Sequence, residues 1–205
     1  NPTLGYPEIK NTEAITYLMV VESTNDRVML FDPANGDLID ANFIVDVTNF
    51  STPIEALLSP AFTVLTSNQI GDNVVIHDTN GVFNSVFYGG NTADLDNVRG
   101  TAFTPGFSSL LVTVGGGANS DAVAEIDPFG IYLGNFIDSA SGGLLSPFDI
   151  AFRTNDCLVA GINSDAVHRY DLTGNPLGIF ASGISFPEQI AFVPNGNVLV
   201  VNFST

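Results

Sequence analysis

The sequence predicts an all-β fold, a β-propeller with blades of about 45 residues, four complete and a fifth partial. This prediction rests on a sequence motif that is repeated four times. The motif is an Asp, any residue and a Val, followed by a short apolar run, a second Asp and a Gly. The copies begin at Asp26, Asp72, Asp121 and Asp165. These starts lie 46, 49 and 44 residues apart, a period typical of repeated β-sheet units. No long amphipathic period of the helical kind interrupts the copies, so we expect almost no helix.

The clearest unit runs from Pro147 to Phe180. Phe148 to Phe152 and Cys157 to Ile162 are short apolar segments separated by an Asn-Asp turn, and Ala166 to Tyr170 predicts a third strand. A tight turn from Asp171 to Gly174 leads into a fourth, outermost strand. Four antiparallel strands with short turns form one blade, which must stack on its neighbours to bury both faces.

The other units align with this one and divide the chain. We expect an N-terminal segment, residues 1–14, outside the repeat and a propeller domain over residues 15–205. The predicted blades are approximately 15–51, 52–97, 98–145 and 146–185, with a partial blade at 186–205. The stretch from Asp138 to Leu145 is a longer insertion between blades.

The composition limits the classes of partner. The chain carries 22 acidic side chains against 5 Lys and Arg, a net charge of −17. Nucleic acid is excluded because phosphate binding requires clustered Lys and Arg. No apolar run is long enough to span a membrane. An acidic, Lys-poor surface suits an exported protein, so we expect an extracellular or cell-surface location.

The single Cys157 cannot form an internal disulfide, and its apolar neighbours predict a buried, inert thiol. The chain begins at Asn1 without Met or a signal-like stretch. We therefore expect a processed piece of a longer exported precursor.

The repeated Asps predict turns. The second Asps, Asp32, Asp78, Asp127 and Asp171, are expected to accept hydrogen bonds from turn amides, and the first Asps to cap the turn into the third strand. A calcium loop needs several carboxylates in one short segment, and no such run occurs.

The stretch from Asn25 to Gly36 resembles the NHL repeat, whose pattern is a polar turn, Arg-Val or Arg-Ile, an aromatic-Asp pair and a Gly. Val167 to Gly174 is similar. The copy at Asp72 lacks the Arg, and the copy at Asp121 lacks both Arg and aromatic. The resemblance implies a propeller used for binding or scaffolding, with a minority of relatives being enzymes.

The partial blade leaves an open edge. The chain stops at Thr205, after a predicted second strand, and unpaired main-chain groups there are a template for another strand. The ring could close with the N-terminal segment as an irregular strand, the protein could continue past Thr205, or a neighbouring subunit could supply strands. Asn1 to Ala14 is the natural donor in the last case.

The first residues of the inner strands surround the mouth of a central channel. By alignment Glu55, Gly100, Asp149 and Gln189 occupy one level there, with Glu8 and Glu188 close by. This arrangement resembles the gluconolactonase-like propellers, in which carboxylates and an Asn hold a divalent metal. The resemblance implies Glu55, Asp149 and Gln189 as candidate metal ligands and a divalent cation as the one candidate cofactor. The alternative interpretation is that these side chains form an acidic rim that binds only water. Those enzymes use six blades and a fuller ligand set.

Other candidate residues have structural interpretations. His77 and His168 fall in the third strands of different blades, and we expect each to be half exposed. Neither lies beside a Ser or Cys in a nucleophile context, so a catalytic triad has no support. Asn49 and Asn202 begin sequons and are glycosylation candidates if the chain is exported through a glycosylating pathway.

Two functional hypotheses follow. The first is an extracellular, non-enzymatic propeller that acts as a scaffold or interaction module, partnered by other proteins or by copies of itself in a fibre or surface assembly. The alternative is a metal-dependent, lactonase-like hydrolase or lyase that uses the acidic channel mouth. No catalytic residue is predicted under the first hypothesis.

Overall fold

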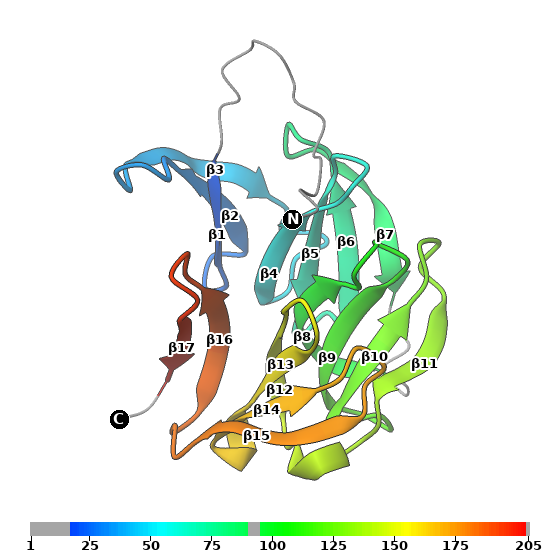
Figure 1. Ribbon diagram of the computed structural model, residues 1–205. Coiled ribbons are helices and arrows are strands. Elements are labelled where there is room, and N and C mark those ends of the chain that lie inside the picture. Colours follow the sequence, from blue (N-terminus) through cyan, green and yellow to red (C-terminus); the bar gives the residue numbers. More distant parts are fainter. Residues whose placement is uncertain (1–16, 90–94, 204–205) are drawn as a thin grey trace.

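The computed structural model describes residues 17–89 and 95–203, and within them regular structure is almost entirely β (Figure 1). Five antiparallel sheets follow one another in chain order. The first contains β1 (Leu18–Glu22), β2 (Arg27–Phe31) and β3 (Leu38–Val45). The second contains β4 (Pro53–Leu58), β5 (Val64–Asn68), β6 (Asn73–His77) and β7 (Phe83–Gly89). The third contains β8 (Asp96–Phe103), β9 (Leu110–Gly116), β10 (Ala122–Ile126) and β11 (Tyr132–Ile137). The fourth contains β12 (Pro147–Phe152), β13 (Cys157–Gly161), β14 (Ala166–Tyr170) and β15 (Pro176–Ser182), and the last contains β16 (Pro187–Phe192) and β17 (Val198–Asn202).

Each four-stranded sheet is a simple antiparallel meander, as the alternating apolar segments and turns predict. The strands of the Pro147 unit lie where the sequence predicts them. Helix is confined, among the described residues, to two 3-10 turns, η1 (Ser141–Gly143) and η2 (Ile162–Ser164). η1 lies in the predicted insertion. No described helix has the length and apolarity needed to cross a bilayer.

The sheets are arranged as an arc around a central space (Figure 1). The innermost strands β4, β8, β12 and β16 contact one another in succession, and β1 contacts β4. The first sheet and the β16–β17 sheet stand at the two ends of this arc. Among the described residues the first sheet shows three strands, and the predicted N-terminal segment, residues 1–14, lies outside them.

The core lies between successive sheets. Alternation along β9 sends Leu110 and Val112 into the cluster shared with the second sheet and Leu111 into the cluster shared with the fourth. Strands β5 and β13 are buried along their whole length because sheets cover both of their faces. This double coverage explains why the second strands read as continuous apolar runs.

The first Asp of each repeat ties one sheet to the next. Asp26, Asp72, Asp121 and Asp165 accept main-chain N–H bonds from Thr52, Asn97, Ser146 and Phe186 at 2.9, 2.7, 2.6 and 3.2 Å. Each donor precedes or begins the inner strand of the following sheet. The prediction of side-chain to backbone bonds is therefore confirmed, but the expected partner within the local turn is wrong. All eight residues have φ between 49° and 63°, so two left-handed turns face each other across every junction.

The second Asps form turns as predicted. Asp127, for example, accepts the N–H bonds of Phe129 and Ile131 at 2.8 and 2.9 Å, and Gly130 follows with φ 83°. Gly130 has a second role, because a Cβ there would lie 1.9 Å from the carbonyl oxygen of Phe87 on the outer strand of the preceding sheet. A Cβ at Gly81 would likewise clash with the carbonyl oxygen of Phe43, and a Cβ at Gly174 with the carbonyl oxygen of Phe136.

The burial of the phenylalanine near the end of each inner strand depends on whether a neighbouring sheet covers it. Phe103 and Phe152 are partly buried and pack against the clusters between sheets. Alignment of the repeats places Phe192 at the position of Phe152 and predicts an equivalent core residue, but Phe192 is 41% exposed, so this prediction is wrong for the described residues. The described β16–β17 sheet has no outer strands, so nothing described covers its ring. Cys157 is fully buried, and desolvation raises the pKa of its thiol to about 12, as an inert core cysteine requires.

Candidate functional site

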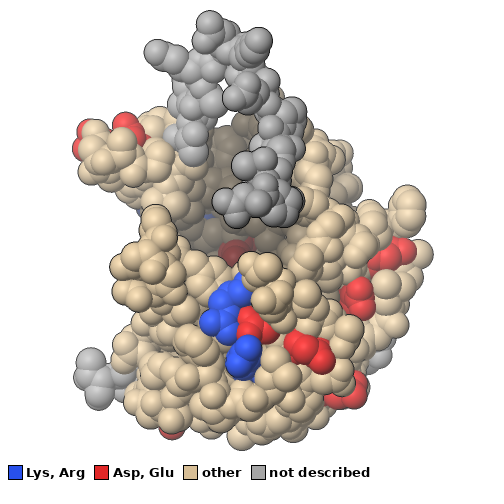
Figure 2. Space-filling model, in the orientation of Figure 1, with Lys and Arg blue, Asp and Glu red and all other residues tan. Residues whose placement is uncertain are grey.

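A cavity of about 340 Å³ opens at the centre of the arc. It is bounded by β1, by Ile54, Glu55 and Ala56 of β4, and by Gln189 of β16. Figure 2 shows the molecule hollowed there, with an acidic side chain visible in the hollow. The structure thus brings two of the predicted site residues, Glu55 and Gln189, to one cavity.

A β-bulge in every inner strand aims these residues. The pairing register shifts between Pro53 and Glu55 in β4, between Pro147 and Asp149 in β12, and at the corresponding places of β8 and β16. A bulge re-aims the side chains beside it and is common next to binding sites. The repeated bulge places Glu55, Gly100, Asp149 and Gln189 in equivalent positions, as the alignment predicts.

Glu55 reaches across to the next inner strand. Its Oε2 accepts the main-chain N–H of Thr101 and, at 3.1 Å, the Thr101 hydroxyl. Part of the side chain stays open to the cavity, yet protein surrounds the carboxyl closely. Desolvation and the charge of Asp149 raise the pKa of Glu55 to about 8, so at neutral pH this carboxyl holds its proton.

Asp149 makes the same kind of contact two junctions further along, from β12 to β16. Its Oδ2 accepts the main-chain N–H of Ile190 on β16 at 2.8 Å, and its Oδ1 accepts the N–H of Ile150 at 2.7 Å. Asp149 is 7% exposed. Desolvation raises its pKa to about 6 despite the two amide donors, which act in the opposite direction.

Gly100 occupies the same level on β8 without a side chain. A Cβ there would lie 2.4 Å from the carbonyl oxygen of Phe148 and 2.6 Å from Cα of Asp149. The backbone of β12 therefore approaches β8 too closely for any side chain, and carboxylates at this level stand on alternate sheets.

Arg99 was not predicted from the sequence as a site residue. It is 7% exposed, and its guanidinium donates to the hydroxyl of Ser146 at 2.9 Å and to the carbonyl of Pro147 at 3.2 Å. Its Nε donates to Asn97, and its charge lies over the Phe148 ring at 5.4 Å. The signal that could have found it is that Arg99 is the one basic residue in the predicted inner strands.

Burial dominates the electrostatics around Arg99. Desolvation lowers its pKa, and the charges of Glu188 and Asp121 act in the opposite direction. Glu188 is predicted to lie near the channel mouth. Desolvation raises the pKa of its carboxyl, and the charge of Arg99 opposes this rise. The charges of Arg99 and Glu188 therefore stabilise each other. Glu8, the other predicted neighbour, lies outside the described residues.

The two histidines are buried, so the expectation of half-exposed residues is wrong. His77 is 0% exposed, and its Nε2 lies 3.0 Å from Oδ2 of Asp46, with Phe50 and Phe83 packed edge-on around the ring. His168 is 2% exposed and bonds the hydroxyl of Ser164 at 2.8 Å. The third strand is covered on both faces by adjacent sheets, which single-strand patterning does not reveal.

The carboxylates of the candidate metal set are engaged by the fold. A divalent cation needs ionised ligands with free lone pairs, whereas Glu55 and Asp149 bond main-chain amides and have raised pKa values. Within residues 17–89 and 95–203, no group of three or more His, Cys, Asp and Glu side chains is placed to hold a metal ion. These residues as arranged do not fit a metal at neutral pH, and the metal site stays a prediction for calorimetry to test.

The two sequon residues lie in different surroundings, Asn49 half-buried and Asn202 exposed. Asn49 stands in the turn after β3, and its amide donates to both carboxylate oxygens of Asp46 at 3.0 and 2.8 Å. Asn202 ends β17 and is exposed. Glycosylation at either position stays a prediction.

No protein-family model matches the chain, and no curated protein matches its sequence. Solved structures match its fold. One is a nidogen/laminin complex structure, with a TM-score of 0.72, 13% identity and coverage of 93% of this chain and 69% of that one. Another is a putative gluconolactonase, with a TM-score of 0.70, 16% identity and coverage of 91% and 67%.

A third is virginiamycin B lyase from Staphylococcus aureus, with a TM-score of 0.60, 11% identity and coverage of 95% of this chain and 69% of that one. The chain thus spans about two thirds of the length of these structures. At such low identities the likeness bears on the fold alone. This chain has an all-β, propeller-like fold. Similar folds occur in a nidogen/laminin complex and in proteins named as a gluconolactonase and a lyase.

Proposed function

We propose that the chain is a non-enzymatic β-propeller module of an extracellular or cell-surface protein and that it acts by binding other proteins. In this proposal it contributes four blades and part of a fifth. The acidic, Lys-poor composition supports an exported location, and the fold likeness to a structure of a nidogen/laminin complex supports a role in protein binding.

One observation carries the proposal. Glu55 and Asp149, which stand where a propeller enzyme would aim catalytic carboxylates, bond the main chain of the next inner strand instead. Each carboxyl spans a junction, from β4 to β8 and from β12 to β16. These hydrogen bonds hold neighbouring sheets in register, as a rigid scaffold requires.

Titration calorimetry with Ca²⁺, Zn²⁺ and Mn²⁺ tests the non-enzymatic assignment. We expect no binding tighter than millimolar at pH 7. Micromolar binding that is lost in Glu55→Gln would instead establish the metal site and remove the proposal.

Self-association is a further part of the proposal. The outer edge of β17 pairs with no strand among the described residues. Leu199 and Val201, which belong to this strand, are 55% and 54% exposed. An extended segment of a second copy could pair there, and the proposed donor is Asn1 to Ala14, which lies outside the described residues. Deleting Asn1 to Ile9 should abolish oligomers in size-exclusion chromatography and leave the β circular dichroism intact. Oligomers that survive the deletion would contradict the donor role.

A lactonase-like hydrolase is the second candidate, and one observation favours it. Glu55 is protonated at neutral pH and faces a cavity that Gln189 also lines, so it could donate a proton to a leaving group. Hydrolysis of simple lactones at pH 6 to 8 that disappears in Glu55→Gln would support this candidate. Rates equal in the two proteins would dismiss it.

A further inference from the structure

Two turns on one face of the molecule share a sequence pattern, Ser or Thr, Pro, a small residue, Phe and again Ser or Thr, and they share a conformation. The β4–β5 turn contains Ser59-Pro60-Ala61-Phe62-Thr63, and the β8–β9 turn contains Thr104-Pro105-Gly106-Phe107-Ser108. The N–H groups of Phe62 and Phe107 bond the carbonyls three residues earlier at 2.9 and 2.8 Å. Both phenylalanines have left-handed backbones, with φ 58° and 59°.

Phenylalanine is a poor choice at this position. The equivalent β16–β17 turn has Gly196 there, with φ 87° and the same bond, from its N–H to the carbonyl of Val193 at 2.9 Å. Glycine adopts this conformation freely, whereas a bulky side chain is strained in it. Such strain at two matching positions favours a functional reason over a structural one.

Both rings are largely exposed, although the Phe107 ring lies edge-on to Phe103 with their centroids 5.7 Å apart. Phe62 is 69% exposed and Phe107 is 58% exposed, and Phe129 on the neighbouring β10–β11 turn is 86% exposed. A cluster of exposed aromatics on adjacent turns is unusual for a surface that meets only water. These three residues are called here the phenylalanine rim.

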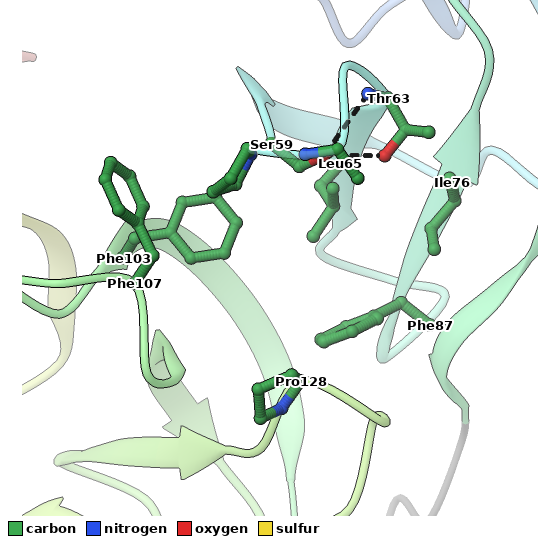
Figure 3. A pocket seen from close by; sticks show the side chains of 10 residues that line it. Ser59, Thr63, Leu65, Ile76, Phe87, Phe103, Phe107 and Pro128 are labelled. Carbon is green, nitrogen blue, oxygen red and sulfur yellow. Dashed lines mark hydrogen bonds between the residues drawn. The ribbon is translucent and has the colours of Figure 1, made fainter. Parts of the chain in front are cut away.

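An apolar cleft of about 310 Å³ opens between the turns that carry this rim. In Figure 3, Phe103 and Phe107 stand on one side of the cleft, Ile76 and Phe87 on the other, and Pro128 at its edge. The hydroxyls of Ser59 and Thr63 bond each other at 2.8 Å, so they are already paired. The cleft has the size and lining to take one apolar side chain.

Charge selects the class of partner. The three turns that line the cleft, residues 59–63, 104–109 and 127–131, contain no Lys or Arg. Asp127 stands at the start of one of them. Asp78 begins the β6–β7 turn of the second sheet, where hydrogen bonds from the main-chain N–H groups of Val82 and Asn80 hold the pKa of its carboxyl below its usual range. The whole chain has a net charge of −17, which disfavours a second copy or an anionic lipid surface on this face.

We propose that the cleft and the phenylalanine rim bind a basic segment of a protein partner, which inserts an apolar side chain between Phe87 and Phe107. This inference rests on the proposed binding function and names its surface and the chemistry of its partner. Phe62 and Phe107 surround the inserted side chain, and the acidic turns attract the flanking Lys or Arg.

The test uses a peptide probe. The chain contains no Trp, so the fluorescence of a Trp peptide reports binding without background. We compare a peptide with a Trp-Leu pair flanked by lysines and the same peptide flanked by glutamates. The basic peptide should bind saturably with a blue shift, the acidic one at least tenfold more weakly, and the double variant Phe62→Gly, Phe107→Gly should bind the basic peptide at least tenfold more weakly.

The glycine variant separates binding from folding. Because Gly relieves the left-handed strain, its melting temperature should equal or exceed that of the parent. Val47→Ser, an 82% exposed apolar residue near the Asp46 turn, is the matched control and should bind like the parent.

Several outcomes would overturn the inference: no saturable binding of the basic peptide up to about 1 mM, equal binding of both peptides, or unchanged binding by the glycine variant. A glycine variant with a clearly lower melting temperature would show that the rings are structural. Phenylalanine-dependent binding to phosphatidylcholine–phosphatidylserine vesicles without peptide binding would assign the rim to a membrane. None of these results bears on the metal titration or on Glu55, so the proposed function stands or falls separately.

Discussion

The carboxylate of Asp121 accepts the main-chain N–H of Ser146 at 2.6 Å, joining the β9–β10 turn to the start of the next inner strand. Both residues have left-handed backbones, with φ 63° and 51°. The same pairing recurs at every junction from Asp26 to Phe186. Stacking of the sheets is therefore fixed by a directional bond as well as by apolar burial.

Replacing Asp121 by Ala should cost about 1 to 3 kcal/mol, because the N–H of Ser146, which is 8% exposed, loses its acceptor away from water. Chemical denaturation measures this loss. Asp165→Ala is the matched variant: its partner Phe186 is 43% exposed and the bond is 3.2 Å long, so water can replace it and the cost should stay below about 1 kcal/mol. Equal costs for the two variants would show that the junction bond contributes nothing beyond the local turn.

Glu55 should make stability depend on pH. Its pKa is raised from the ordinary 4.5 to about 8, so the folded state holds the proton more tightly than the unfolded state does. The stabilisation is fully present below pH 4.5 and is lost as pH rises toward 8, with a slope of at most about 1.4 kcal/mol per pH unit. Glu55→Gln keeps an acceptor for Thr101 and should flatten this fall, most clearly above pH 6.

Urea denaturation from pH 5 to 9 checks the slope. Asp78→Asn is the control, because the pKa of Asp78 is lowered below its ordinary 3.8 and the group titrates outside this window. A fall in stability that is as steep in Glu55→Gln as in the parent would mean that Glu55 is ionised in the folded protein at neutral pH.

Phe152 and Phe192 occupy equivalent places on β12 and β16, but their surroundings differ. Phe152 packs against the cluster between the third and fourth sheets and lies 6.3 Å from Phe136, whereas Phe192 is 41% exposed. Phe152→Ala should cost about 3 kcal/mol and Phe192→Ala less than about 1 kcal/mol. Thermal unfolding of both variants measures the difference. Similar large losses would indicate that another surface covers Phe192 in solution.

Cys157 offers a reporter of global opening. Its thiol is fully buried and its pKa is raised to about 12, so a thiol reagent at pH 8 should react only when the core opens. The labelling rate should rise steeply across the urea transition. Fast labelling in native buffer would show that the fourth sheet opens locally.

Much of the fold could be predicted because its causes are local. The Asp-to-Gly turns, such as Asp127 to Gly130, are fixed by side-chain acceptors and a positive φ within four residues. The strands around Cys157 and Tyr170 follow from short apolar runs between such turns. The equivalent level of Glu55 and Asp149 also follows from the repeat, because every inner strand carries the same bulge.

Other properties depend on which sheets meet. His77 looks half exposed along its own strand, and only the two neighbouring sheets bury it. Arg99 finds its acceptors at Ser146 and Pro147, which no local pattern connects to it. The pKa of Glu55 is raised first by the desolvation that the surrounding protein imposes and then by the charge of Asp149, nearly a hundred residues away along the chain.

The sequence by itself determined the repeat, the strands, the turns and the place of the buried thiol, because these depend on residues within one unit. The tertiary structure decided that Asp121 bonds the next sheet, that the pKa values of Glu55 and Asp149 are raised, and that the turns of Phe62 and Phe107 flank one cleft. The physical reason is that hydrogen bonds across a junction, desolvation and shared apolar surface arise only when units that are distant in sequence pack together.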